Sequence, residues 1–183
     1  MGRELWIAFR ILIVLTVLTG LIYPGAVTGL AMLLFKDQAQ GSLLNRDGKI
    51  VGSALLSQAF KKAEYFHPRS SAAGSEGYDA GNSAGTNLGP TSRKLVDRVK
   101  TSVEAFRKEN PQHSGAIPAD LLTTSASGLD PHISPASADV QAPRIAAARN
   151  IPLPRLHELI AMHTEAPTFG LNFWILELRW SAI

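Results

Sequence analysis

The strongest pattern in the chain is an uninterrupted apolar run from Ile11 to Phe35, 25 residues without a charge, directly after Arg10. A helix of that length reaches roughly 37 Å, which exceeds the ~30 Å hydrocarbon core of a bilayer. We therefore expect a transmembrane helix over 11–35. A cleaved secretory signal is the competing interpretation, because Gly29-Leu30-Ala31 has small residues at a cleavage-like spacing. The run continues beyond that spacing, which favours a retained anchor.

Basic residues flank the apolar run on both sides, so the positive-inside rule does not distinguish the two orientations. A short tail that ends in Arg10, followed by a long domain, favours a cytoplasmic N-terminus and an extracytoplasmic C-terminal domain. Within the run, Gly25 and Gly29 form a G-x-x-x-G pair, which lets membrane helices approach closely, although small residues are common in any membrane helix. Pro24 predicts a kink in the helix.

The rest of the chain alternates short strand patterns with helical periods. In order, the patterns predict a hairpin of 42–46 and 49–53 around Asp47-Gly48, a brief helix over 53–62, helices over 92–110, 135–149 and 153–163, and a final buried strand over Phe173–Leu178. The fold class is therefore α+β: one N-terminal transmembrane helix, then a single, mostly helical extracytoplasmic domain with a small β component. The expected organisation is a cytoplasmic tail over 1–10, the span over 11–35 and the domain over 36–183.

A glycine-rich stretch from Tyr65 to Pro90 interrupts these patterns, with many Ser, Ala and Asn residues and almost no aliphatic side chains. A flexible linker has a similar composition. Larger side chains recur along the stretch, which fits an ordered loop better than a spacer. They are Tyr65, Phe66, His67, Arg69, Tyr78 and Asn87.

Composition limits the functions that the domain can have. The chain has 18 Lys and Arg, two of them before residue 36, and 15 Asp and Glu, one of them before residue 36, so the rest carries a net charge of only +2. That balance gives no support to nucleic-acid binding. The chain has no cysteine, which excludes disulfides, a lipoprotein anchor and cysteine-bound zinc.

Catalytic motifs are weak. Gly81-Asn82-Ser83-Ala84-Gly85 is a literal G-x-S-x-G, but a nucleophile elbow needs an apolar strand before it and a helix after it, and neither pattern is present. His157 and His163 are six residues apart, about 240° around a helix, so they cannot share a metal as a zinc-protease pair does. We predict no catalytic residue and no metal site, and the cofactor-binding residues are unknown from the sequence. The oxygen-rich loop over 65–90 suits hard cations in general but lacks a carboxylate cluster, which favours a purely structural role.

Several motifs occur in a fixed order behind the single anchor. They are Tyr65-Phe66-His67-x-Arg69, the run Ser83 to Pro90, the run Thr124 to Pro135, Gln141-x-Pro143-Arg144 and Ala148-Arg149-Asn150. In their order and spacing they resemble the C subunit of the bacterial potassium-transporting Kdp ATPase, the KdpC family. The chain departs most from that family at its C-terminus, where Trp174 and Arg179 replace amide residues, so contacts of the terminal strand are not carried over.

The resemblance implies a non-catalytic subunit of a high-affinity, ATP-driven potassium uptake complex in the bacterial inner membrane. In that family a channel-like potassium-selective subunit and a P-type ATPase subunit are the partners, and the small subunit is described as stabilising the assembly and as a catalytic chaperone that raises the ATP affinity of the ATPase subunit. No cofactor is expected to bind firmly, and ATP is implied only through the partner. The chain lacks the Asp-Lys-Thr-Gly phosphorylation motif.

Candidate interface residues come from the anchor and from the loop motifs. They are Gly25, Gly29, Tyr65, Phe66, His67, Arg69, Asn87, Ser127, Gly128 and Asp130. We expect the loop residues to hold 65–90 in one conformation that docks on the channel-like partner. The alternatives from other classes are a membrane-anchored extracytoplasmic hydrolase that uses Ser83, and a sensor domain.

Overall fold

The computed structural model describes residues 2–165 and 175–176 of the 183. The chain divides into two compact units, residues 1–53 and residues 54–183. The first unit contains the long N-terminal helix and a hairpin, and the second contains the helical domain with a small sheet. The predicted mixture of helices with a minor β component is confirmed.

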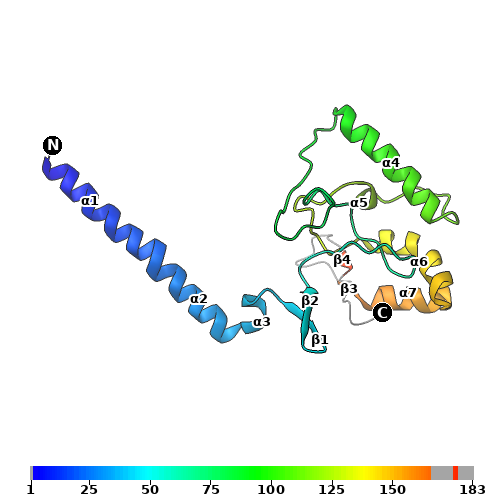
Figure 1. Ribbon diagram of the computed structural model, residues 1–183, viewed down its shortest axis with the longest axis horizontal. Coiled ribbons are helices and arrows are strands. Elements are labelled where there is room, and N and C mark those ends of the chain that lie inside the picture. Colours follow the sequence, from blue (N-terminus) through cyan, green and yellow to red (C-terminus); the bar gives the residue numbers. More distant parts are fainter. Residues whose placement is uncertain (1, 166–174, 177–183) are drawn as a thin grey trace. The chain divides into compact units, whose positions relative to one another are not determined.

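The N-terminal helix runs through α1 (Gly2–Val17), a π-helical turn η1 (Leu18–Ile22) and α2 (Tyr23–Leu34), drawn in blue in Figure 1. Together they make 33 residues, long and apolar enough to cross a membrane, and no residue of the three elements is buried. The helix thus begins nine residues before the predicted span. The π turn ends two residues before Pro24, whose missing N–H and bulky ring disturb the regular α-helical hydrogen bonding.

A short helix α3 (Lys36–Ala39) leads into the predicted hairpin, which is confirmed. β1 (Leu43–Arg46) pairs antiparallel with β2 (Lys49–Ser53), with an irregularity after Leu44. Asp47 and Gly48 both have positive φ, at 53° and 76°, which is the backbone that a two-residue type I′ turn requires.

The brief helix predicted over 53–62 is wrong: β2 extends to Ser53, and turns and irregular backbone follow up to residue 64. A tertiary contact explains the difference, because the Ser57 backbone N–H donates to the carbonyl of Leu129 at 2.9 Å, whereas in a helix it would bond four residues back. The side chain of Leu55 is 58% exposed, so the apolar residues of this segment do not form a buried helical face.

Three helices of the second unit follow their predicted ranges closely: α4 (Arg93–Glu109), α6 (Pro135–Arg149) and α7 (Leu153–Met162). A one-turn helix α5 (Ala119–Leu122) lies between α4 and α6. Ser134 caps α6 by accepting a hydrogen bond from the Ser137 N–H, and Asn150 ends it in the left-handed conformation, at φ 56°.

The core of this unit lies where α6 and α7 pack together, shown in gold and orange in Figure 1. Its buried members are Phe66, Ile133, Ala138, Ala142, Ile145, Ala146, Leu156 and Ile160. The alanines let the two helices and the chain around Phe66 approach closely. The first residues of the glycine-rich stretch are therefore anchored in the core.

The last described element is β4 (Ile175–Leu176), which pairs antiparallel with β3 (Thr164–Glu165). Strand structure is thus confirmed for two residues of the segment expected over 173–178, and its other residues lie outside the described part of the chain. The pairing strand β3 follows α7 almost directly and was not predicted from the sequence.

Candidate functional site

The glycine-rich segment over 65–90 contains neither helix nor strand, yet it is tied to the loop over 124–130 along its length. The guanidinium of Arg69 donates to Asp130 Oδ2 at 3.1 Å and to the Thr124 carbonyl at 3.2 Å. The Tyr78 hydroxyl donates to the Arg69 carbonyl at 2.9 Å, and the burial of the phenol raises its pKa. The prediction of an ordered loop is confirmed.

Ser127 and Gly128 connect the two loops most closely. The Ser127 carbonyl accepts hydrogen bonds from the Ala84 N–H at 3.0 Å and from the Ser83 hydroxyl at 2.9 Å. The Gly128 carbonyl accepts one from the Ser71 hydroxyl at 2.6 Å. Gly128 has a φ of 69°, and a Cβ there would lie 2.6 Å from the Ala84 carbonyl oxygen, so only glycine fits.

The segments 65–90 and 124–130 together form a loop cluster, and Asp130 is its charged centre. Its second carboxylate oxygen, Oδ1, accepts hydrogen bonds from the backbone N–H and from Nδ1 of His132, at 3.0 and 3.1 Å. The side-chain hydrogen bond from His132 is the main cause that lowers the pKa of Asp130, with partial burial opposing it and the charge of Arg69 helping. This carboxylate therefore stabilises the fold above about pH 4, and the contribution is lost as the pH falls through its lowered pKa.

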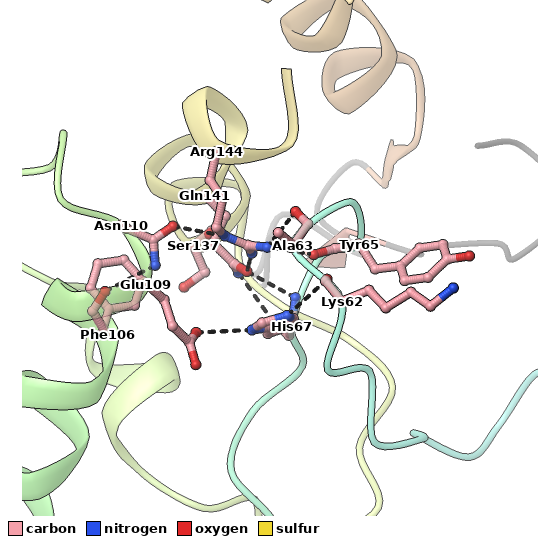
Figure 2. Close-up of polar contacts among 10 residues, drawn as sticks. All are labelled: Lys62, Ala63, Tyr65, His67, Phe106, Glu109, Asn110, Ser137, Gln141 and Arg144. Atoms are coloured by element: carbon pink, nitrogen blue, oxygen red, sulfur yellow. Dashed lines mark hydrogen bonds and ion pairs between the residues drawn. The ribbon is translucent and has the colours of Figure 1, made fainter. Parts of the chain in front are cut away.

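A second polar cluster, shown in Figure 2, fixes the start of the glycine-rich segment on α6. The Gln141 side chain pairs with the backbone of His67: its Oε1 accepts from the His67 N–H at 2.8 Å, and its Nε2 donates to the His67 carbonyl at 3.2 Å. Gln141 is only 1% exposed, and its Nε2 also donates to the Ser137 carbonyl at 3.1 Å. The Gln141 amide thus satisfies both the N–H and the carbonyl of His67, as a neighbouring β-strand would.

Arg144, one turn further along α6, donates to four acceptors on three segments. Its guanidinium bonds the carbonyls of Ala63 and Tyr65 at 2.6 and 3.1 Å, Asn110 Oδ1 at 3.0 Å and Gln141 Oε1 at 2.8 Å. Burial lowers the pKa of Arg144, and the nearby charge of Glu109 counteracts this. An arginine pKa starts so high that the group stays charged. Arg144 is therefore a permanently charged cross-link between α6, Asn110 at the end of α4, and residues 63–65.

The structure places the predicted residues in three groups. Arg69, Ser127, Gly128 and Asp130 lie together in the loop cluster. Tyr65, Phe66 and His67 lie at α6, where the Arg149 guanidinium is 5.4 Å from the Tyr65 ring centroid. Phe66 is 6% exposed and belongs to the core, so its side chain is not presented to a partner in this structure.

The remaining candidates are exposed. Asn87 has a positive φ of 50°, a conformation that asparagine adopts more readily than most residues. Gly25 and Gly29 lie on the open surface of the N-terminal helix, where an added Cβ would meet no atom within 4 Å.

Sequence reasoning quoted Gln141 and Arg144 only as part of a motif and missed their role. The available signal for Gln141 was its position: Ser137, Gln141 and Ile145 follow one another at intervals of four residues and share the buried face of α6. A glutamine on such a face needs buried partners.

Asp120 was missed too: its carboxylate accepts hydrogen bonds from the Ser137 hydroxyl at 2.6 Å and from the Ser134 N–H at 2.9 Å. Burial by itself raises the pKa of Asp120, but the hydrogen bonds from Ser137 and Ser134 lower it by more, so the pKa lies below its usual value.

The motifs weighed for catalysis do not form an active site. The Ser83 hydroxyl is exposed and donates to a backbone carbonyl, and the backbone around it is irregular on both sides, so this is not a nucleophile elbow. His163 Nδ1 lies 2.8 Å from the Leu159 carbonyl oxygen within its own helical turn. Among the described residues, no group of three His, Asp or Glu side chains is arranged to hold a metal.

The fold and the site thus define a small α+β domain whose loops are cross-linked by polar side chains, and the described residues include one candidate membrane span. Residues 5–173 match the family described as "KdpC: K+-transporting ATPase, c chain". The chain belongs to the KdpC family.

Curated relatives agree with this assignment. The "Potassium-transporting ATPase KdpC subunit" of Myxococcus xanthus is 53% identical over 165 residues, which cover 90% of this chain and 78% of the relative. The proteins with the same name from Bradyrhizobium diazoefficiens and Mycobacterium bovis are 50% and 52% identical, and each match covers 93% of this chain and 90% of the relative.

Proposed function

We propose that this chain is the non-catalytic, membrane-anchored subunit of an ATP-driven potassium uptake complex. In this role it joins a channel-like potassium-selective subunit to a P-type ATPase subunit and stabilises their assembly. The observation that carries the proposal is the family match along residues 5–173, together with relatives named as subunits of a potassium-transporting ATPase. The absence of the Asp-Lys-Thr-Gly motif from the sequence supports a partner as the site of ATP hydrolysis.

The proposed topology is a retained anchor with a cytoplasmic N-terminus and the domain outside the cytoplasm, in the bacterial inner membrane. The 33-residue helix supports retention, because its ~50 Å length crosses the hydrocarbon core and the headgroup regions. It continues three residues beyond the cleavage-like spacing that ends at Ala31, without a break.

Protease added to intact spheroplasts should therefore digest the domain and leave a small membrane-embedded fragment. Mass spectrometry of that fragment should find the original N-terminus. Complete protection of the domain would reverse the orientation, and a mature chain that begins near Met32 would replace the anchor with a cleaved signal.

The anchor is proposed to pack against a partner helix through Gly25 and Gly29. Support comes from the open surface above both glycines, which offers a backbone groove to another helix. The double substitution Gly25→Leu with Gly29→Leu should weaken the complex by roughly 1 kcal/mol per lost close contact, without affecting membrane insertion.

Co-purification of the partner subunits across a detergent series measures this loss. Ala26→Leu is the control, because it introduces a leucine side chain about 100° away around the helix. Equal recovery of the partners with the double variant and the control would show that the glycine pair faces lipid.

The loop cluster is proposed to dock on the channel-like partner. Hydrogen bonds within the domain order residues 65–90 before the partner binds. The ordering cost of roughly 1–2 kcal/mol per residue is therefore part of folding and does not weaken the binding of the partner. Arg69, Ser127 and Asp130 then act by holding the loop, while exposed polar residues such as Asn82 and Asn87 form the surface that a partner meets.

A direct contact with ATP does not fit the proposed topology, because ATP is cytoplasmic and that topology places the helical domain outside the cytoplasm. We therefore propose that the chain raises ATP affinity indirectly, by binding one conformation of the ATPase subunit better than another. Coupling of that kind is typically worth a five- to 150-fold change in affinity, on the order of 1–3 kcal/mol.

ATP hydrolysis by the complex, measured with and without this chain, tests the indirect route. The KM for ATP should rise roughly five- to 150-fold when the chain is omitted, and a photoreactive ATP analogue should label the ATPase subunit alone. Ser83→Ala should keep the wild-type KM, and that result would remove the hydrolase alternative. An unchanged KM would contradict the proposed coupling, and labelling of this chain would make the contact direct.

A further inference from the structure

The N-terminal helix contains a widened turn close to the middle of its apolar run. At the end of η1 the Tyr23 N–H donates to the Leu18 carbonyl, which is five residues back instead of four. Thr19, inside this turn, lies four residues from Tyr23, the midpoint of the run 11–35, or about 6 Å along the helix axis. At that depth the hydrocarbon core of a bilayer surrounds a spanning helix.

Within the described helix, the carbonyl of Thr19 lacks a backbone donor in both helical registers. In an α-helix it would accept a hydrogen bond from the N–H of residue 23, and in a π-helix from the N–H of residue 24. The Tyr23 N–H donates to Leu18 instead, and residue 24 is a proline, which has no N–H. The widened turn and the proline together leave this carbonyl without its helical partner.

The side chains described around this carbonyl do not supply the missing donor. The Thr19 hydroxyl donates to the Leu15 carbonyl at 2.7 Å, one turn back, so its proton is already used. The side chains of Leu21 and Ile22 are apolar, and they are 68% and 57% exposed. Gly20 has no side chain, and a Cβ added there would meet only one atom, at 4.0 Å. The backbone of the turn is therefore open to a neighbouring molecule.

An unpaired carbonyl is costly in hydrocarbon, because neither lipid tails nor apolar side chains can donate a hydrogen bond. Proline is tolerated in a membrane helix where a neighbouring helix satisfies the backbone group that the proline has freed. A hydroxyl or amide side chain suits this role, because a charged donor would itself be expensive at the same depth. The chemistry of the turn thus asks for a neutral donor from outside the helix.

We propose that the Thr19 carbonyl is a docking point for a membrane helix of a partner subunit, which donates a hydrogen bond to it from a hydroxyl or amide side chain. The inference rests on the proposed function, because it takes the partner to be a spanning subunit of the same complex. Close packing at Gly25 and Gly29 is open to any helix with a matching surface. The hydrogen bond to Thr19 adds a requirement for a polar donor at one depth, which selects the partner helix and its register.

Carbonyl ¹³C NMR of the full chain in lipid nanodiscs, with and without the partner subunits, tests this docking point. Labelling threonine carbonyls with ¹³C and glycine nitrogens with ¹⁵N selects the two Thr-Gly bonds of the sequence, Thr19-Gly20 and Thr28-Gly29. Thr28 lies inside the regular helix α2 and is the internal control. A hydrogen bond moves a carbonyl ¹³C signal downfield, so the Thr19 signal should move downfield on assembly and the Thr28 signal should stay in place.

Pro24→Ala restores an N–H and permits a regular α-helix, in which the Tyr23 N–H returns to the Thr19 carbonyl. In this variant the Thr19 signal should lie downfield in the chain alone and should not move on assembly. Affinity for the partners should fall roughly three- to twentyfold, the range that measured hydrogen bonds between membrane helices span. Val27→Ala is the control, because it shortens an exposed side chain of the same helix without restoring an N–H, and it should behave like the wild type.

A Thr19 signal that stays in place when the partner subunits are bound would overturn the docking point and leave the proposed function intact. A downfield Thr19 signal in the wild-type chain alone would overturn it too, because water or a second copy of the chain would then be the donor. Failure of the proposed function would appear in the recovery of the partner subunits and not in the carbonyl signal, so the two failures are distinguishable.

Discussion

Gly128→Ala is expected to lower the free energy of unfolding of the domain by about 3 kcal/mol. Two costs add: a left-handed backbone at φ 69°, worth about 1–2 kcal/mol for a residue with a Cβ, and overpacking, worth about 1–3 kcal/mol. The new Cβ would lie 2.6 Å from the Ala84 carbonyl oxygen and 2.8 Å from the Ala73 nitrogen. Both are backbone atoms, so neither can swing aside.

Pulse proteolysis of the full chain in detergent, across a urea or temperature series, measures this loss. A loss of 3 kcal/mol corresponds to a drop in Tm on the order of 10 °C for a chain of this size. Gly89→Ala is the matched control: it lies in the same segment, and an added Cβ there meets nothing within 4 Å. If both variants unfold like the wild type, the close approach of the two loops is not what holds the glycine-rich segment.

Arg144→Met is expected to cost about 2–4 kcal/mol. Methionine keeps much of the aliphatic bulk of arginine but has no hydrogen-bond donor. The Tyr65 carbonyl and the Asn110 side-chain oxygen would therefore each lose a partly buried hydrogen bond. Leaving such a group unsatisfied costs about 1–3 kcal/mol each. Arg144→Lys should recover little, because a single ammonium cannot reach acceptors on three segments at once.

The control for this series is Arg155→Met on α7. Arg155 is exposed, and among the described residues its side chain pairs only with Glu158 one turn away, at 2.9 Å, so its loss should cost less than about 1 kcal/mol. Hydrogen exchange should also accelerate around residues 63–67 in Arg144→Met and not in Arg155→Met. Equal effects of the two substitutions would show that Arg144 does not cross-link the cluster.

Periodic segments were predictable from the sequence because local pattern and tertiary role agree in them. In α4, Leu95, Val99, Val103 and Phe106 recur at helical spacing before the stop at Asn110-Pro111, and the helix ends at Glu109. The hairpin followed from Asp47-Gly48, whose left-handed backbone is a local property. Helix α6 has the range 135–149 that was predicted for it.

Non-local contacts set what the sequence could not predict. Residues 54–64 contain apolar side chains at plausible helical spacing, but a hydrogen bond from Ser57 to Leu129 crosses 72 positions of sequence and fixes an irregular path. In the loop cluster, Arg69 and Asp130 were singled out by type, while their pairing with each other was visible only in the fold. Gln141 was overlooked because hydrophobic periodicity counts a polar residue on a buried face only as a break in the pattern. It does not show that the side chain bonds a distant backbone segment.

Purification of the affinity-tagged full chain from membranes in mild detergent tests the central claim most directly. The account predicts that a channel-like subunit and a P-type ATPase subunit come with it in near-equal amounts, and that the preparation hydrolyses ATP faster when potassium is added. Recovery of the chain without either partner, or ATP hydrolysis that ignores potassium, would contradict the assignment to a potassium-transporting ATPase.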